Sequence, residues 1–96
     1  MTKTCSAKVE IANRLGLHAR PAMLFVETAS GFQSKITVRR CDQPEEHIDG
    51  KSIMQMMMLA ATRGTAIEII VEGEEQEVQK AIKALVALVE RKFDED

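Results

Sequence analysis

The chain has 96 residues, of which 45% are hydrophobic and 29% charged, and its formal net charge is −2. A chain of this length supports a single modest core, so we expect one domain over residues 1–96. The acidic balance, with no Trp, no Tyr and three scattered Phe, excludes the basic and aromatic surface on which nucleic-acid binding depends.

Other classes of protein are excluded by local pattern. No apolar run approaches the roughly 20 residues that cross a bilayer, and the N-terminus lacks the apolar core of a signal peptide. We therefore expect a cytoplasmic protein that does not bind membranes. Cys5 and Cys41 have neither CxxC nor Cys–His spacing, which indicates reduced structural thiols and no metal site. Glycine-rich nucleotide loops and Ser/His/Asp spacing are also missing, so we expect no cofactor and no hydrolase.

The first half of the chain alternates between strand and helix patterns. Every second residue is apolar over residues 4–12, which predicts a half-buried strand, and residues 13–17 form a loop. A helix is then expected up to Gly31, with Pro21 tolerated in its first turn. The apolar positions of this helix recur at three- and four-residue spacing, and the expected core face consists of Ala19, Ala22, Val26 and Ala29.

The second half predicts a hairpin, a helix, a strand and a final helix. Strands are expected over residues 32–40 and 46–49, a Met-rich helix over 52–61, and a strand over 65–72. The last helix follows Gly73, and the acidic residues 94–96 have the wrong charge for a helix end, so they are expected to fray. The order βαββαβα predicts the α+β class, with an antiparallel sheet covered by helices on one face.

The entrance of the first predicted helix carries the most informative residues. His18 precedes the helix and Arg20 lies in its first turn. Unpaired amides and the positive end of the helix dipole favour an anion at such a position. A neutral imidazole can form a labile bond to phosphorus, and a guanidinium can pair with phosphoryl oxygens. A single His in a loop is ordinarily polar surface, but the joint occurrence of His18, Arg20 and Pro21 predicts a site for a phosphoryl group.

The run Leu-Gly-Leu-His-Ala-Arg-Pro-Ala at residues 15–22 resembles the active-site signature of the HPr family, the histidine-containing phosphocarriers of the sugar phosphotransferase system. The resemblance covers nearly the whole chain. It implies an open-faced β-sandwich in which three helices cover one face of a four-stranded sheet. It also implies a phosphoryl carrier, without turnover of its own, that accepts phosphate on Nδ1 of His18 from phosphorylated enzyme I and passes it to enzyme IIA-type proteins.

The same resemblance assigns the residues around His18. Arg20 matches the arginine that stabilises the phosphate, and Asn13 has the position that in some members buttresses the histidine. Gly16 permits close approach of the loop, and Pro21 fixes the helix start. The positions expected to support the phosphate are therefore Asn13, Gly16, Ala19 and Pro21.

Ser52 allows two interpretations. Residues 52–55 fit a capping box, in which the Ser52 hydroxyl binds the Gln55 amide and the Gln55 side chain reaches back. The segment Lys-Ser-Ile-Met at residues 51–54 resembles the regulatory serine segment of the HPr family, which implies phosphorylation by an HPr kinase/phosphorylase and binding to a transcriptional regulator. The sequence alone is compatible with both the capping role and the regulatory role.

The clustered methionines predict a docking surface. Residues 54 and 56–58 are all Met, and they cannot all be buried against one sheet, so some face outward. The expected docking residues are Met23, Leu24, Ile53, Met54 and Met57.

His47, in an acidic hairpin, is expected at the surface, and the protein is expected to be a monomer.

Two other functions are compatible with parts of this pattern. The first is a purely regulatory protein that acts through Ser52 phosphorylation and docking, and the second is a small-ligand-binding α+β domain. The turn over residues 41–46 is longer than in common sugar-system members, and the Phe-Asp-Glu-Asp ending resembles the nitrogen-related branch. The sequence therefore leaves the branch, sugar or nitrogen, open.

Overall fold

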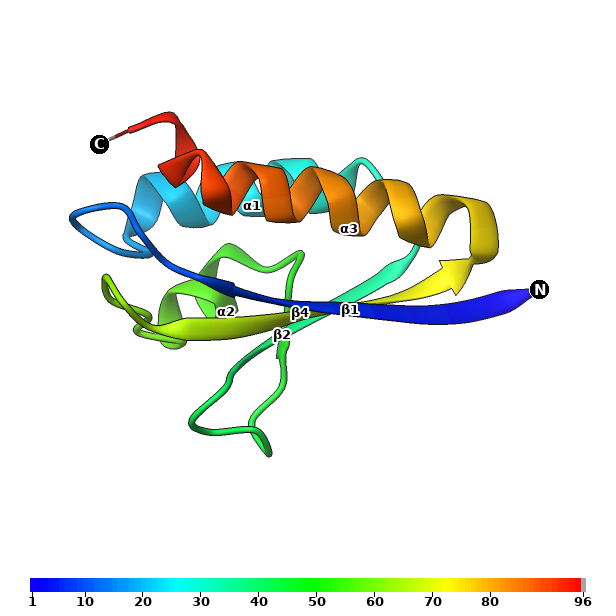
Figure 1. Cartoon of the computed structure of the whole chain (residues 1–96), viewed down its shortest axis with the longest axis horizontal. Coiled ribbons are helices and arrows are strands. Elements are labelled where there is room, and N and C mark those ends of the chain that lie inside the picture. Colours follow the sequence, from blue (N-terminus) through cyan, green and yellow to red (C-terminus); the bar gives the residue numbers. More distant parts are fainter. Residues whose placement is uncertain (96) are drawn as a thin grey trace.

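The computed structural model describes residues 1–95. Four strands and three helices follow the predicted order, and a short 3-10 helix is added at the end (Figure 1). In chain order the elements are β1 (Thr2–Glu10), α1 (Ala19–Ser30), β2 (Lys35–Arg40), β3 (Ile48–Asp49), α2 (Ile53–Met58), β4 (Ala66–Glu74), α3 (Glu75–Glu90) and η1 (Lys92–Asp94). Among these residues no helix is both long and apolar enough to cross a membrane.

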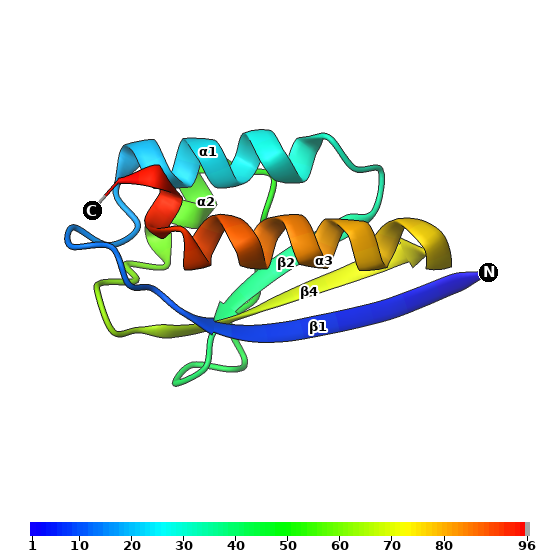
Figure 2. The same ribbon diagram turned by 45° about the horizontal axis from the view of Figure 1, so that its top comes forward.

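The sheet is antiparallel throughout, with the strand order β1-β4-β2-β3. Helices α1 and α3 lie beside each other over one face of the sheet, as Figures 1 and 2 show from two directions. The predicted α+β open-faced sandwich is therefore confirmed.

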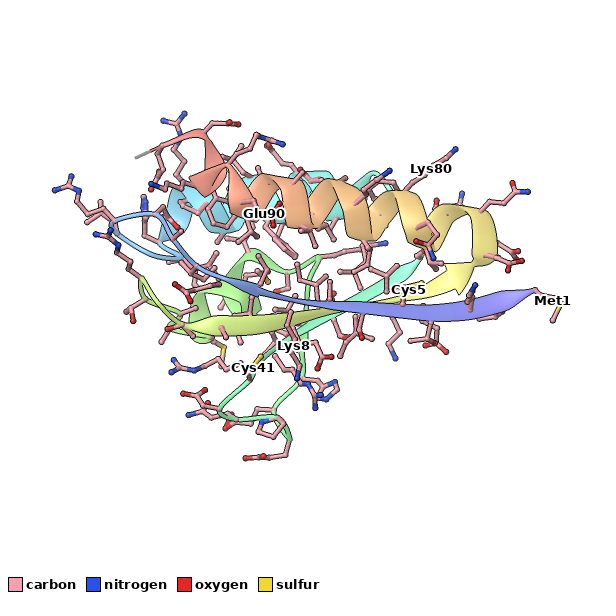
Figure 3. All side chains as sticks on the ribbon, in the orientation of Figure 1. Met1, Cys5, Lys8, Cys41, Lys80 and Glu90 are labelled. Atoms are coloured by element: carbon pink, nitrogen blue, oxygen red, sulfur yellow. The ribbon has the colours of Figure 1, made fainter. Side chains whose placement is uncertain are left out.

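Alternation along the strands decides which face is covered. The side chains of β4 that point toward the helices, Ile67, Ile69 and Val71, are fully buried. On β1, Cys5 packs against this core, whereas Lys8 lies on the opposite face, away from the helices (Figure 3). Each buried aliphatic side chain contributes about 1.5–3 kcal/mol relative to exposure. The period-two pattern thus decides the side on which the helices pack.

The second strand is shorter than predicted. It begins at Lys35, and residues 32–34 lie outside it. The reason is Glu77 of α3, whose carboxylate accepts hydrogen bonds from the backbone N–H groups of Gln33 (3.1 Å) and Ser34 (2.8 Å) and from the Ser34 hydroxyl. Because these bonds favour the ionised form, they lower the pKa of Glu77, the Ser34 hydroxyl most of all. A helix side chain therefore replaces the sheet as the partner of this segment.

The core face of α1 also differs from the prediction. Ala22, Val26 and Ala29 are buried as expected, but Ala19 is exposed. Phe25 was left out of the predicted face, although it lies three residues after Ala22 and four before Ala29, and it is fully buried. The first turn of the helix lies at the edge of the packed region, so its small apolar residue faces a surface groove instead of the core.

Helix α2 is limited to Ile53–Met58, where residues 52–61 were predicted. The helix ends early because Ala60 takes a positive φ of 51°, which is incompatible with a right-handed helix. Met56 is fully buried, whereas Met54 and Met58 are about three-quarters exposed, at 76% and 74%. The prediction that some of the clustered methionines face outward is confirmed.

The prediction that residues 94–96 fray is wrong for Asp94 and Glu95, and Asp96 lies outside the described residues. After α3 the chain turns through η1, where Lys92, Phe93 and Asp94 all have positive φ. Phe93 is fully buried, and burial of an aromatic ring is worth enough to offset this backbone strain. The ring therefore anchors the end of the chain.

The loop over residues 41–47 projects from the sheet on the side away from the helices (Figure 1). His47 in this loop is exposed, as predicted. The strand after the loop, β3, contains only Ile48 and Asp49, where residues 46–49 were expected. The loop therefore lies on the opposite side of the sheet from α1.

Candidate functional site

His18 is the N-cap residue of α1. Its backbone is extended (φ −81°, ψ −169°), and its carbonyl accepts the first helical hydrogen bond, from the Ala22 amide at 3.0 Å. Its imidazole makes no capping hydrogen bond and is 37% exposed. The ring is therefore accessible at a helix N-terminus, where the first amides have no partner within the helix.

Pro21 and Arg20 complete the first turn as the sequence predicted. Pro21 is buried, and its missing N–H removes a donor that no helical carbonyl would accept. Arg20 is exposed, and its charge is close enough to act on the carboxylate described below. His18 and Arg20 therefore both lie at the N-terminal end of α1.

The loop before the helix is held by a tight set of backbone contacts. The Leu17 amide donates to the Ala61 carbonyl (2.8 Å), and the His18 amide donates to the Gly16 carbonyl (3.0 Å). Gly16 has φ +69°, and a Cβ added there would lie 2.7 Å from the Ala61 oxygen. Only glycine combines this conformation with this close approach.

Asn13 is fully buried beneath the loop. Its side-chain N–H₂ group donates to the Gly16 carbonyl at 2.6 Å and to Oε2 of Glu95 at 3.0 Å. Its side-chain oxygen Oδ1 is buried without a hydrogen-bond partner among residues 1–95. One amide thus connects the loop that carries His18 to the end of the chain.

Glu95 is a site residue that the sequence reasoning missed. Its Oε2 atom lies 2.9 Å from Nε2 of His18, and the same oxygen accepts from Asn13. Figures 1 and 2 both show the C-terminal segment beside the start of α1. The contact spans 77 positions in sequence. The signal in the sequence is Phe93, a large apolar residue within a charged C-terminal segment, which could have indicated that this segment packs against the core.

Glu95 is ionised at neutral pH. The hydrogen bond from His18 is the main reason that the pKa of Glu95 lies below its ordinary value of 4.5. Partial burial opposes this shift, whereas the bond from Asn13 and the positive charge of Arg20 act in the same direction as the bond from His18. The site therefore contains an imidazole, a guanidinium and a carboxylate in one small volume.

The predicted docking residues are gathered beside this site. Ala19, Arg20, Met23, Leu24 and Ile53 line a shallow apolar groove between α1 and α2. The exposed side chains of Met54 and Met57 extend from the same short helix as Ile53. We call this set the apolar groove surface, defined by Met23, Leu24, Ile53, Met54 and Met57.

Ser52 caps α2, as the capping-box interpretation predicted, with its hydroxyl accepting from the Gln55 amide at 3.2 Å. The reciprocal bond was wrongly predicted. The Gln55 side-chain oxygen accepts instead from the Asp49 amide (2.8 Å), and the Ser52 amide donates to the Asp49 carbonyl (3.1 Å). The hairpin turn supplies the partners because it folds directly against the helix start.

Cys5 and Cys41 are free cysteines, each partly buried. Within the part of the chain that the structure describes, no three His, Cys, Asp or Glu side chains are grouped so that they could hold a metal ion.

Comparisons with known proteins agree with this geometry. The family model "PTS HPr component phosphorylation site" matches residues 5–91. The phosphocarrier protein HPr of Pseudomonas aeruginosa is 46% identical over 88 residues, which cover 92% of this chain and 93% of that protein. The phosphocarrier protein NPr of Proteus mirabilis is 42% identical, covering 93% and 94%. The crystal structure of HPr-C-His from Thermoanaerobacter tengcongensis has a TM-score of 0.86 at 43% identity, covering 96% and 98%.

The glycine requirement at position 16 can be tested against a second glycine with positive φ. Gly64 has φ +91°, and a Cβ there would meet nothing within 4 Å. Gly64→Ala should therefore lose only the conformational term, about 1 kcal/mol of the free energy of unfolding. Gly16→Ala adds a clash with backbone atoms, and we expect it to lose at least about 1 kcal/mol more. Urea denaturation of both variants measures the difference, and equal losses would contradict the close approach at Gly16.

Proposed function

The chain belongs to the HPr family of phosphocarrier proteins, and on this premise we propose that His18 carries the phosphoryl group. The donor is phosphorylated enzyme I, and the acceptor is an enzyme IIA-type protein. The observation that supports this most directly is the placement of His18 as an N-cap whose accessible ring makes no capping bond. A residue kept only for helix capping would use its side chain to bind the first amides.

The surroundings of His18 suit both the transfer and its product. The first-turn amides and the helix dipole stabilise negative charge beside the ring. Arg20 adds a planar cation that can bind two phosphoryl oxygens at once. Asn13, Gly16, Ala19 and Pro21 act through the backbone, because they determine where the ring and the amides lie. These roles require no metal and no cofactor from the chain.

The apolar groove surface is proposed as the docking site for the phosphoryl donor and acceptor. It adjoins the site, since Arg20 lines the same groove as Met23 and Ile53. Flexible methionine side chains adapt to more than one partner, as a carrier requires. We further propose that the carrier works as a monomer in the cytoplasm, because a second copy on this surface would cover His18.

A second candidate function is regulation through Ser52. The Ser52 hydroxyl lies at the start of α2, where a phosphate would have a favourable electrostatic environment, and Ile53 of the groove surface is the next residue. Phosphorylation there would place two negative charges at the edge of the docking surface. We propose that an HPr kinase/phosphorylase modifies this serine and that a transcriptional regulator binds the modified form. The presence of both His18 and Arg20 argues against regulation as the sole role.

The remaining alternative, a small-ligand-binding domain, is the weakest of the three. The groove beside His18 is open and shallow, whereas small-molecule sites enclose most of their ligand. Both branches of the family remain candidates for the pathway, because the relatives include HPr and NPr proteins.

Transfer to His18 is tested by intact mass. Incubation with phosphoenolpyruvate, enzyme I and magnesium should add one phosphate that mild acid removes, and His18→Ala should gain none. Arg20→Ala should still be phosphorylated, but about ten- to a hundredfold more slowly, because a charge-assisted hydrogen bond of about 1.5–3 kcal/mol is lost. Failure of the wild-type chain to gain an acid-labile phosphate would refute the proposed function.

The docking surface is tested by Ile53→Glu. Glutamate is favourable in the first turn of a helix, so the fold should be retained while the apolar contact is lost. We expect the KM for phosphorylated enzyme I to rise about tenfold, as for loss of about 1.4 kcal/mol of binding, with little change in kcat. Gln76→Glu is the matched control, since it also adds one negative charge to a first turn, that of α3. Equal KM values for the two variants would show that the groove is not the docking site.

Regulation is tested with ATP and an HPr kinase/phosphorylase. The wild-type chain should gain one phosphate that survives mild acid, and Ser52→Ala should gain none. The phosphorylated chain should accept phosphate on His18 more slowly, because the added charge repels an acidic donor surface. An acid-stable phosphate on Ser52→Ala would assign the modification to another residue.

A further inference from the structure

The contact between Glu95 and His18 has a chemical consequence for the transfer step. We propose that Glu95 is a positioning residue for His18. By accepting a hydrogen bond from Nε2, Glu95 keeps the imidazole proton on that nitrogen and leaves the lone pair of Nδ1 free to bond to phosphorus. This inference deepens the proposed function and rests on it. It depends on three atoms: the Glu95 oxygen Oε2, the His18 nitrogen Nε2 at 2.9 Å, and the Asn13 nitrogen Nδ2 at 3.0 Å.

The tautomer follows from which groups can donate. An ionised carboxylate has acceptors only, so a ring nitrogen 2.9 Å from Oε2 must carry the hydrogen. The low pKa of Glu95 keeps that carboxylate ionised at neutral pH. In a neutral imidazole only one nitrogen bears a proton, so a proton on Nε2 leaves Nδ1 as the nucleophile.

Glu95 is itself held in place from two sides. Asn13 donates to the same oxygen, and because its side chain is fully buried it fixes the position of the Glu95 carboxylate. Phe93 anchors the turn two residues earlier, also fully buried. The carboxylate is therefore positioned before any partner arrives, which lowers the entropic cost of orienting the ring.

The carboxylate also balances charge during transfer. The Nδ1 lone pair forms the bond to phosphorus, while the bond between phosphorus and the donor breaks and the donor keeps that electron pair. Nε2 retains its proton, so the ring gains positive charge as the new bond forms. The adjacent carboxylate stabilises this charge, as the aspartate does for the imidazolium of a Ser-His-Asp triad. When the phosphate leaves, Nδ1 recovers its lone pair and the ring is neutral again.

Two substitutions separate the hydrogen bond from the charge. The amide oxygen of Glu95→Gln can still accept from both His18 and Asn13, so this variant removes the charge alone. Glu95→Ala removes the hydrogen bond as well. Glu90→Ala is the control, because Glu90 is an exposed glutamate on α3, close to the same end of the chain (Figure 3).

The first readout is spectroscopic and independent of transfer. In ¹⁵N-histidine-labelled protein without phosphate, the wild type and Glu90→Ala should show a slowly exchanging, downfield Nε2–H resonance for His18. Glu95→Ala should lose it through exchange with water. Persistence of that resonance in Glu95→Ala would overturn the proposal, because it would show that the hydrogen bond to Glu95 is not what protects the Nε2 proton from exchange.

The second readout is the rate of transfer from phosphorylated enzyme I. We expect kcat to fall about tenfold in Glu95→Ala and less in Glu95→Gln, with KM unchanged. This is the lower end of the roughly 10–100-fold effect that carboxylates orienting a metal-bound histidine contribute, and the orienting role is the same here. Wild-type or faster transfer in Glu95→Ala, or a change in KM alone, overturns the proposal. Absence of phosphate on the wild-type chain would instead refute the proposed function, an outcome distinguishable because the Nε2–H resonance is measured separately.

Discussion

The buried amide of Asn13 is the contact on which the site depends. It binds the Gly16 carbonyl on one side and the Glu95 carboxylate on the other, so it joins the loop before α1 to the end of the chain. Because the amide is fully buried, loss of either partner would leave polar atoms unpaired away from water. The position of His18 is therefore determined by long-range packing as well as by its place at a helix start.

The fold explains why the site is a surface feature and not a cavity. One layer of helices on one sheet buries a single core, and that core is filled mainly by the apolar faces of β2, β4, α1 and α3. The space left for binding is the groove where α1 and α2 meet, which opens to solvent next to His18. Such a shape suits a protein whose phosphorylated group must be reached by two partners in turn, because an enclosed site would exclude both.

At two places a group from outside the predicted element replaces the expected local hydrogen-bond partner. Glu77 of α3 takes the backbone amides that would have extended β2. The backbone carbonyl and amide of Asp49 replace the reciprocal bond that was expected between the Ser52 amide and the Gln55 side chain. Glu77 lies more than forty positions from the amides that it binds, whereas Asp49 lies only six positions from Gln55 and reaches it through the hairpin turn. Periodicity and capping rules describe these segments correctly only up to the point where such contacts intervene.

By itself the sequence determined the order of elements, the buried faces of β1 and β4 and the position of His18, Arg20 and Pro21 at a helix start. These features depend on periodicity and on the chemistry of neighbouring residues, both of which are local. Only the tertiary structure decided that Ala19 faces the groove and that Glu95 reaches His18. The last contact joins residues 77 positions apart, and it exists because Phe93 finds space in the core and turns the chain back toward α1. No local pattern encodes such a return, since the energy that drives it comes from burial against elements formed elsewhere in the chain.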